Sequence, residues 1–193
     1  MSASRLDRNV VVLGGMGVGK STAIQRFLNN EFSDAHYPTV SGTYNKKISI
    51  SDKEYNLTIT DTAGQDETSI LDPTFAGTTD VYVIAFSVAY RKSFDIARVI
   101  RDKILDISGV ESVAMVLVGN KSDLKADRQV PRSEAEDLAK QFGCPYVETS
   151  AKENSNIEEM FVKSVKIANK ARGDDDDQEA GADAGDKSMC IVM

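Results

Sequence analysis

The sequence predicts an α/β fold in which a mostly parallel sheet lies between layers of helices. Strand-like apolar runs at residues 10–13, 81–88 and 113–119 alternate with helical stretches, as in chains built from repeated strand–helix units. One hairpin pattern, at residues 43–51 and 55–60, interrupts this alternation. A chain of 193 residues is also one domain by size.

The individual elements follow from local patterns. Tyr55, Leu57 and Ile59 alternate with polar residues, so the hairpin is expected to turn at residues 52–54. Ser133 and Glu136 have the spacing of a capping box, which predicts a helix running to about Phe142.

Asn156 is expected to cap a last helix in the same way. Its apolar face is formed by Ile157, Met160, Phe161, Ser164, Val165 and Ala168. We interpret this stripe as core packing and not as a cofactor site.

Residues 14–21 read GGMGVGKS and match the phosphate-binding pattern G-x-x-x-x-G-K-[ST] between a strand and a helix. Backbone N–H groups of such a loop and the helix dipole attract phosphate. The Lys20 amine can reach the β- and γ-phosphates, and the Ser21 hydroxyl can ligate Mg²⁺. The alternative is a chance glycine-rich turn. The predicted phosphate-binding residues are Gly17, Val18, Gly19, Lys20, Ser21 and Thr22.

Asn120, Lys121 and Asp123 follow the apolar run at residues 113–119, at the edge of the sheet where ligands of α/β proteins bind. The Asp123 carboxylate can accept hydrogen bonds from N1–H and the 2-amino group of guanine. Adenine lacks both donors and would leave the carboxylate unpaired. The alternative is an ordinary surface turn.

Ser150, Ala151 and Lys152 follow another strand-like run at residues 145–149. Their backbone N–H groups can meet guanine O6. The two segments together favour guanine over adenine.

With these motifs the chain resembles the Ras-type small GTPases over residues 8–171. The motifs that carry the resemblance are residues 14–21, Thr39, residues 61–65 (DTAGQ), residues 120–123 (NKSD) and residues 150–152 (SAK). Within that superfamily, residues 61–70, Met16 and the ending CIVM are most similar to the Rheb subfamily.

The resemblance implies a P-loop NTPase fold of the Ras-like G-domain type, with a six-stranded sheet, that binds GTP or GDP with Mg²⁺. In such proteins Thr39 completes the Mg²⁺ shell begun by Ser21, and Asp61 orders the ion through a water molecule. Phosphoryl transfer needs positioning and charge neutralisation, so Lys20 counts among the catalytic residues.

The resemblance also implies three further roles. Gly64 offers its N–H to the γ-phosphate, Gln65 orients the attacking water, and Phe32 lies across the guanine ring. From the residues alone, the segment around Gln65 can be a polar turn, and Phe32 can be a core residue.

Two of the departures from the Ras pattern lie near the phosphates. Met16 replaces a glycine near the γ-phosphate, where it either crowds an activating protein's arginine finger or points to solvent. His36 takes the place of a tyrosine that covers the phosphates. It is retained as a candidate nucleotide-binding residue, although a histidine in a loop is usually a solvated surface residue.

Composition divides the chain into three parts: a flexible N-terminus at 1–7, a G domain at 8–172 and a disordered acidic tail at 173–193. The net charge is −7, and the tail holds seven acidic residues and one lysine. The G domain itself is therefore nearly neutral, so nothing in it indicates nucleic-acid binding.

Two cysteines, Cys144 and Cys190, make no disulfide framework and favour a reducing compartment. We recognise no signal peptide and no run long enough to span a bilayer.

The tail ends in a C-a-a-X motif with Cys190 as the cysteine to be farnesylated. One lipid chain binds membranes weakly, and acidic residues repel anionic lipids. We therefore expect a monomer on the cytoplasmic face of endomembranes, with a substantial cytosolic pool. The expected partners are an exchange factor, an activating protein and effectors.

Two functions from different classes remain open. One is a slow GTPase switch, which Gln65 favours. The other is a hydrolysis-impaired, mostly GTP-loaded binding module, which Met16 leaves open. An ATP-dependent P-loop kinase is disfavoured by the NKSD segment at residues 120–123.

Overall fold

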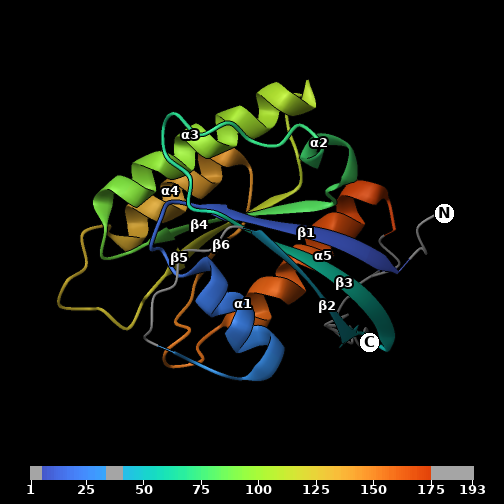
Figure 1. Cartoon of the computed structure of the whole chain (residues 1–193), viewed down its shortest axis with the longest axis horizontal. Coiled ribbons are helices and arrows are strands. Elements are labelled where there is room, and N and C mark those ends of the chain that lie inside the picture. The colour runs from blue at the N-terminus through green and yellow to red at the C-terminus, as the bar shows by residue number, and fades with distance from the viewer. Residues whose placement is uncertain (1–5, 34–40, 175–193) are drawn as a thin grey trace, which may run out of the picture.

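In the computed structural model, which describes residues 6–33 and 41–174, a six-stranded sheet lies between helices (Figure 1). The strands, in the order β2-β3-β1-β4-β5-β6, are β1 (Asp7–Gly14), β2 (Ser41–Ile50), β3 (Lys53–Thr62), β4 (Val81–Ser87), β5 (Met115–Asn120) and β6 (Tyr146–Glu148). The helices are α1 (Lys20–Asn29), α2 (Phe75–Thr78), α3 (Arg91–Ser108), α4 (Arg132–Phe142) and α5 (Ile157–Arg172). Among the six strands of the described residues, only β2 and β3 pair antiparallel, so the predicted fold class is confirmed.

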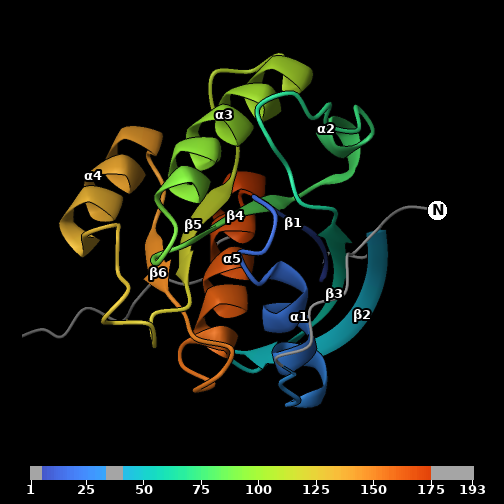
Figure 2. The same ribbon diagram turned by 60° about the vertical axis from the view of Figure 1, so that its left-hand side comes forward.

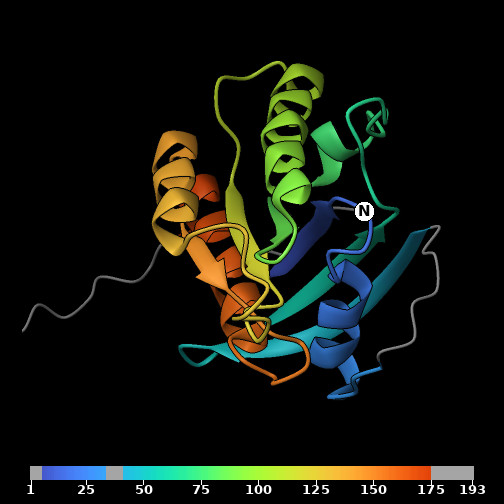
Figure 3. The same ribbon diagram turned by 90° about the vertical axis from the view of Figure 1, so that its left-hand side faces the viewer.

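Helices cover both faces of the sheet, as Figures 2 and 3 show. One core cluster joins α1 and α5 to the sheet, and in it the rings of Phe27 and Phe161 stack with centroids 4.0 Å apart. A second cluster joins α3 and α4 to the other face, where Phe86 and Phe94 meet edge to face. Every residue of β4 is buried because both faces of this strand are covered, which explains its unbroken apolar run.

The turn of the hairpin differs from the prediction. β2 continues to Ile50 and β3 begins at Lys53, so Ser51 and Asp52 alone form the loop, with φ of 47° and 61°. A two-residue loop with both φ values positive matches the right-handed twist of paired strands, which favours this turn at residues 51–52. The predicted alternation in β3 is confirmed, because Tyr55, Leu57 and Ile59 are all buried.

The predicted capping box in α4 is wrong. The helix begins at Arg132, and its N-cap is Pro131, which makes no side-chain capping bond. The Glu136 carboxylate, expected to cap the backbone near Ser133, instead accepts a hydrogen bond of 2.8 Å from the Arg132 guanidinium.

The start of α5 agrees with the prediction in position but not in bonding. Asn156 is the N-cap, yet its Nδ2 donates to the Glu148 carbonyl at 2.8 Å instead of capping the helix. The predicted apolar face is buried throughout, so its interpretation as core packing is confirmed.

The structure of the described residues extends slightly beyond the predicted limits of the G domain. Asp7 already belongs to β1. At the other end α5 stops at Arg172, Gly173 is its C-cap with φ of 72°, and the Asp174 carboxylate accepts a hydrogen bond of 3.0 Å from Arg8. Within the described residues, no helix is both long and apolar enough to cross a membrane.

Candidate functional site

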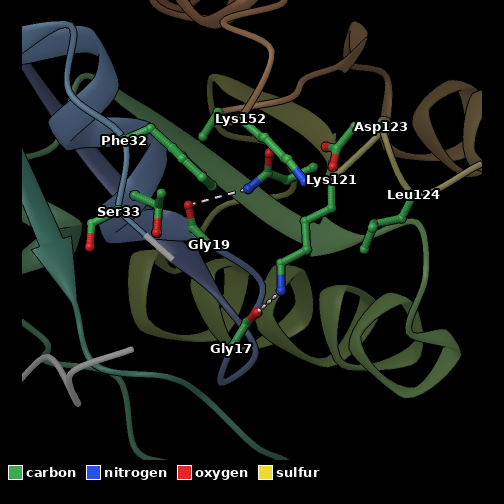
Figure 4. A pocket seen from close by; sticks show the side chains of 11 residues that line it. Gly17, Gly19, Phe32, Ser33, Lys121, Asp123, Leu124 and Lys152 are labelled. Carbon is green, nitrogen blue, oxygen red and sulfur yellow. Dashed lines mark hydrogen bonds between the residues drawn. The ribbon is translucent and has the colours of Figure 1, made fainter. Parts of the chain in front are cut away.

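A pocket of about 450 Å³ opens at the carboxyl ends of the parallel strands. Phe32 enters it from the segment after α1, and Lys121 and Asp123 enter it from the loop after β5 (Figure 4). Its lining residues are Gly17, Gly19, Thr22, Phe32, Ser33, Asn120, Lys121, Asp123, Leu124, Ala151 and Lys152. The fold therefore brings residues predicted to bind phosphate and residues predicted to read guanine to one cavity.

The phosphate loop links β1 to α1 and depends on two glycines. Gly17 and Gly19 have φ of 73° and 93°, in the left-handed region where side chains are strained. A Cβ on Gly19 would also lie 2.5 Å from Nδ2 of Asn120. Val18, between them, is fully buried and does not line the pocket.

Lys20 begins α1 and is 6% exposed. Its Nζ donates to the carbonyls of Gly14 and Gly15 at 3.0 and 3.1 Å. Burial lowers the pKa of this amine to about 8, against the opposing effect of Asp61. These two carbonyls hold the amine inside the loop, next to the Asp61 carboxylate.

Asp61 lies near the end of β3 and is 1% exposed. Burial raises the pKa of its carboxyl group, while the Ser21 hydroxyl and the Lys20 charge act in the opposite direction. Its Oδ1 is buried without a hydrogen-bond partner among the described residues. An unpaired carboxylate oxygen beside a hydroxyl fits Mg²⁺, which binds oxygen ligands.

The described residues contain no group of three or more His, Cys, Asp or Glu side chains that could hold a metal ion. Mg²⁺ in phosphate-binding enzymes commonly has one or two carboxylates and completes its shell with phosphates and water. The pair of Ser21 and Asp61 suits that sharing. Thr39, the third predicted ligand, lies outside the described residues, as do His36 and Cys190.

Asn120 and Lys121 tie the base side of the pocket to the phosphate loop. The Asn120 Nδ2 donates to the Val18 carbonyl at 2.9 Å, and its Oδ1 accepts from Thr149 Oγ1 at 3.1 Å. Lys121 Nζ donates to the Gly17 carbonyl at 2.7 Å. These bonds set the distance between the two ends of the cavity.

Ser150 was predicted to offer its backbone N–H to guanine O6, and in the structure this N–H donates to the Ser155 carbonyl at 3.1 Å. Ser150 is fully buried and does not line the pocket. Its Oγ donates to Asp123 Oδ1 at 2.6 Å and accepts from the Glu153 N–H at 3.0 Å. It therefore orients the carboxylate of Asp123, whose other oxygen makes no hydrogen bond among the described residues.

Gly64 lies against the backbone of Met16, and a Cβ on it would be 2.5 Å from Met16 Cα. The Met16 side chain is 74% exposed, which agrees with the alternative that it points to solvent. Neither residue lines the pocket.

Gln65 is also beside the phosphate loop, because its backbone N–H donates to the Gly14 carbonyl at 3.0 Å. Its side-chain Nε2 donates to the Ala63 carbonyl at 3.0 Å, and its Oε1 is buried without a partner among the described residues. The side-chain amide of Gln65 therefore bonds to the loop that carries Gln65 itself.

Sequence reasoning missed three residues of this region. Leu124 gives the pocket an apolar wall, and its signal was an apolar residue in a polar loop directly after Asp123. Ser33 adjoins Phe32 and gave no signal. Arg26 reaches the base loop from α1, and no motif indicated it.

Comparison with known proteins decides the family. Residues 9–170 match the family model described as "Ras family". The chain belongs to the Ras family. Members of this family of small GTPases hydrolyse GTP, and this chain is a GTPase of that kind.

Three curated relatives show which subfamily of the Ras family the chain is similar to. The chain is 37% identical over 191 residues to "GTP-binding protein Rheb homolog" of Dictyostelium discoideum, covering 99% of this chain and 100% of that protein. It is 39% identical to "Small monomeric GTPase RhbA" of Aspergillus fumigatus, with both chains fully covered. It is 36% identical to human "GTP-binding protein Rheb", covering 97% of each chain. The predicted similarity to the Rheb subfamily is confirmed.

Proposed function

We propose that this chain is a Rheb-like molecular switch that binds GTP and GDP with Mg²⁺ and slowly hydrolyses GTP. The observation that carries the proposal is the carboxylate of Asp123, held in the pocket by the buried Ser150 hydroxyl. One of its oxygens makes that bond, and the other is available for a ligand with donors in one plane. Guanine offers that edge and adenine does not.

The phosphate end of the pocket supports the same proposal. The N–H groups at the start of α1 and the charge of Lys20 favour a polyphosphate. Ser21 and Asp61 would hold Mg²⁺, which neutralises charge developing on the transferred phosphoryl group. Thr39 and Gly64 would then be ordered by the γ-phosphate and released after hydrolysis.

The base assignment is tested with Asp123→Asn. We expect this variant to bind GTP about a hundredfold more weakly and to prefer xanthosine nucleotides, whose oxygen replaces the 2-amino donor. Fluorescence titration with GTP, ATP and XTP measures the three affinities. The matched control is Asp127→Asn, an exposed residue of the same loop that does not line the pocket. Comparable affinities of the native protein for ATP and GTP would contradict the proposal.

A second candidate function is a mostly GTP-loaded binding module with impaired hydrolysis. It is favoured by the Gln65 amide, which bonds to the Ala63 carbonyl and faces its own loop. Single-turnover hydrolysis of bound GTP by Gln65→Leu distinguishes the two functions. A switch should lose at least about tenfold in rate while its GDP affinity stays within about twofold, because water positioning acts only in the transition state. An unchanged rate favours the binding module.

The proposal includes membrane attachment through a farnesyl group on Cys190 and a large cytosolic pool. It also includes regulation by an exchange factor and an activating protein, with effectors that recognise the GTP-bound loops. The support is the C-a-a-X ending, together with an acidic tail that anionic membranes repel.

A further inference from the structure

Arg26, in the last turn of α1, bonds to three backbone carbonyls around the base end of the pocket. Its Nε donates to the Ala151 carbonyl at 2.7 Å, and its Nη2 donates to the Lys152 carbonyl at 3.1 Å. Its Nη1 donates to the Asn30 carbonyl, at the end of α1, at 2.7 Å. Arg26 itself does not line the pocket.

The same guanidinium also supports an aromatic wall of the pocket. Its central carbon lies 5.7 Å from the centroid of the Phe32 ring, within range of a cation–π contact. Arg26 forms no ion pair within the described part of the chain, where its partners are the backbone carbonyls, this ring and, at 3.5 Å, the Asn30 side-chain oxygen. One side chain thus connects the end of α1, the aromatic ring and the loop at residues 150–152.

The bond to Ala151 has a consequence inside the pocket. The Ala151 carbonyl and the Lys152 N–H belong to one planar trans peptide and point in opposite directions. Ala151 and Lys152 line the pocket and Arg26 does not, so a carbonyl turned toward Arg26 turns this N–H toward the cavity. Among the described residues the Lys152 N–H has no backbone acceptor, so it is available for a ligand oxygen.

We infer that Arg26 is a positioning residue for the guanine base, and that it sets how long a bound nucleotide stays. The inference rests on the proposed function. Three carbonyl acceptors and a ring face match the planar fork of arginine, which neither lysine nor glutamine reproduces. Loss of Arg26 leaves the Lys152 N–H and the Phe32 ring without their common support, while the phosphate loop keeps its own bonds to Asn120 and Lys121.

The test measures dissociation of a fluorescent GDP analogue, chased with excess GDP, from the full-length protein. We expect Arg26→Gln to release the nucleotide about tenfold faster, and Arg26→Lys to fall between it and the native protein. Single-turnover hydrolysis of bound GTP should stay within about twofold of native, since the phosphate end is untouched. The effect of Arg26→Gln should be smaller when Phe32 is already replaced by leucine, because part of it acts through that ring.

Arg172→Gln is the matched control, because it removes a partly buried guanidinium that bonds to Asp80 and not to the base loop. A release rate for Arg26→Gln no faster than for this control overturns the inference, as does an equal loss in hydrolysis. Failure of the native protein to prefer guanine nucleotides would instead overturn the proposed function. The two failures are therefore distinguishable.

Discussion

The backbone of Gly64 leaves no room for a side chain beside the phosphate loop. A Cβ there would lie 2.5 Å from Cα, 2.7 Å from Cβ and 2.9 Å from the nitrogen of Met16. Two of these three atoms belong to the backbone, so a change of the Met16 side chain cannot relieve the contact. The closeness of these two residues fixes where the Gly64 N–H lies.

We expect Gly64→Ala to weaken binding of a non-hydrolysable GTP analogue at least about tenfold more than binding of GDP. The added methyl group forces Gly64 away from the position where we propose it meets the γ-phosphate, which GDP lacks. Titration with both nucleotides measures this difference. The double variant Gly64→Ala with Met16→Gly should behave like the single one. Full rescue by Met16→Gly would show that the side chain, and not the backbone, causes the clash.

At the scale of elements, an ion pair joins the loop after β5 to the end of β6. The Arg128 guanidinium donates to both carboxylate oxygens of Glu148 at 2.9 Å, and Tyr146 donates its hydroxyl to the same carboxylate at 3.0 Å. Glu148 immediately precedes the loop at residues 149–152. The pair therefore holds together the two loops that form the base end of the pocket.

Burial raises the pKa of Glu148, but the bonds from Arg128 and Tyr146 outweigh it and leave the pKa below its usual 4.5. The stabilisation is therefore present above pH 4.5 and is lost as the pH falls through the lower pKa of the folded state. We expect Arg128→Gln to cost about 1–3 kcal/mol at pH 7, which lowers the melting temperature by several degrees.

Calorimetry at pH 7 and at pH 4 and below measures the melting temperatures of the native protein and of Arg128→Gln. The difference between these two melting temperatures should narrow as the pH falls. Lys140→Gln, which removes an exposed pair with Asp137, is the control and should be near neutral at both pH values. A difference in melting temperature that stays constant with pH would mean that packing, and not charge, accounts for the lost stability.

At the scale of the whole molecule, the start of the tail is fixed to the beginning of β1, an interior strand of the sheet. Arg8 in β1 is 1% exposed, donates to Asn169 Oδ1 at 2.8 Å and to Asp174 Oδ2 at 3.0 Å, and lies over the Tyr55 ring. The tail therefore leaves the domain from one defined point, although acidic residues continue at 175–177.

This contact determines how tail charge can be tested. Lysines at residues 175–177 should move the protein toward the plasma membrane, because each basic residue near an anionic surface contributes about 1 kcal/mol. Adding Asp174→Lys should lower the melting temperature, because the new lysine would face the buried guanidinium of Arg8. Fluorescence imaging of the variants, with Cys190→Ser as the fully soluble control, checks localisation. Stable plasma-membrane residence of the native protein would indicate that a partner supplies the second attachment signal.

The sequence alone determined the fold class and the family, and it predicted the phosphate loop and the guanine-reading segment. These features are local: residues 14–21 are contiguous, and a buried strand such as β4 is read from its own apolar run. The apolar stripe of α5 is equally local, since its spacing follows from helix geometry alone.

Only the tertiary structure decided how the site is held together. Ser150 is buried, and its hydroxyl donates a hydrogen bond to the Asp123 carboxylate. The carboxylate of Glu136 was drawn to Arg132 instead of to a helix cap. Arg26 reached a loop more than a hundred residues away in the chain. Partners such as these are chosen by which segments the folded chain brings within hydrogen-bonding distance, and a local pattern in the sequence carries no record of that proximity.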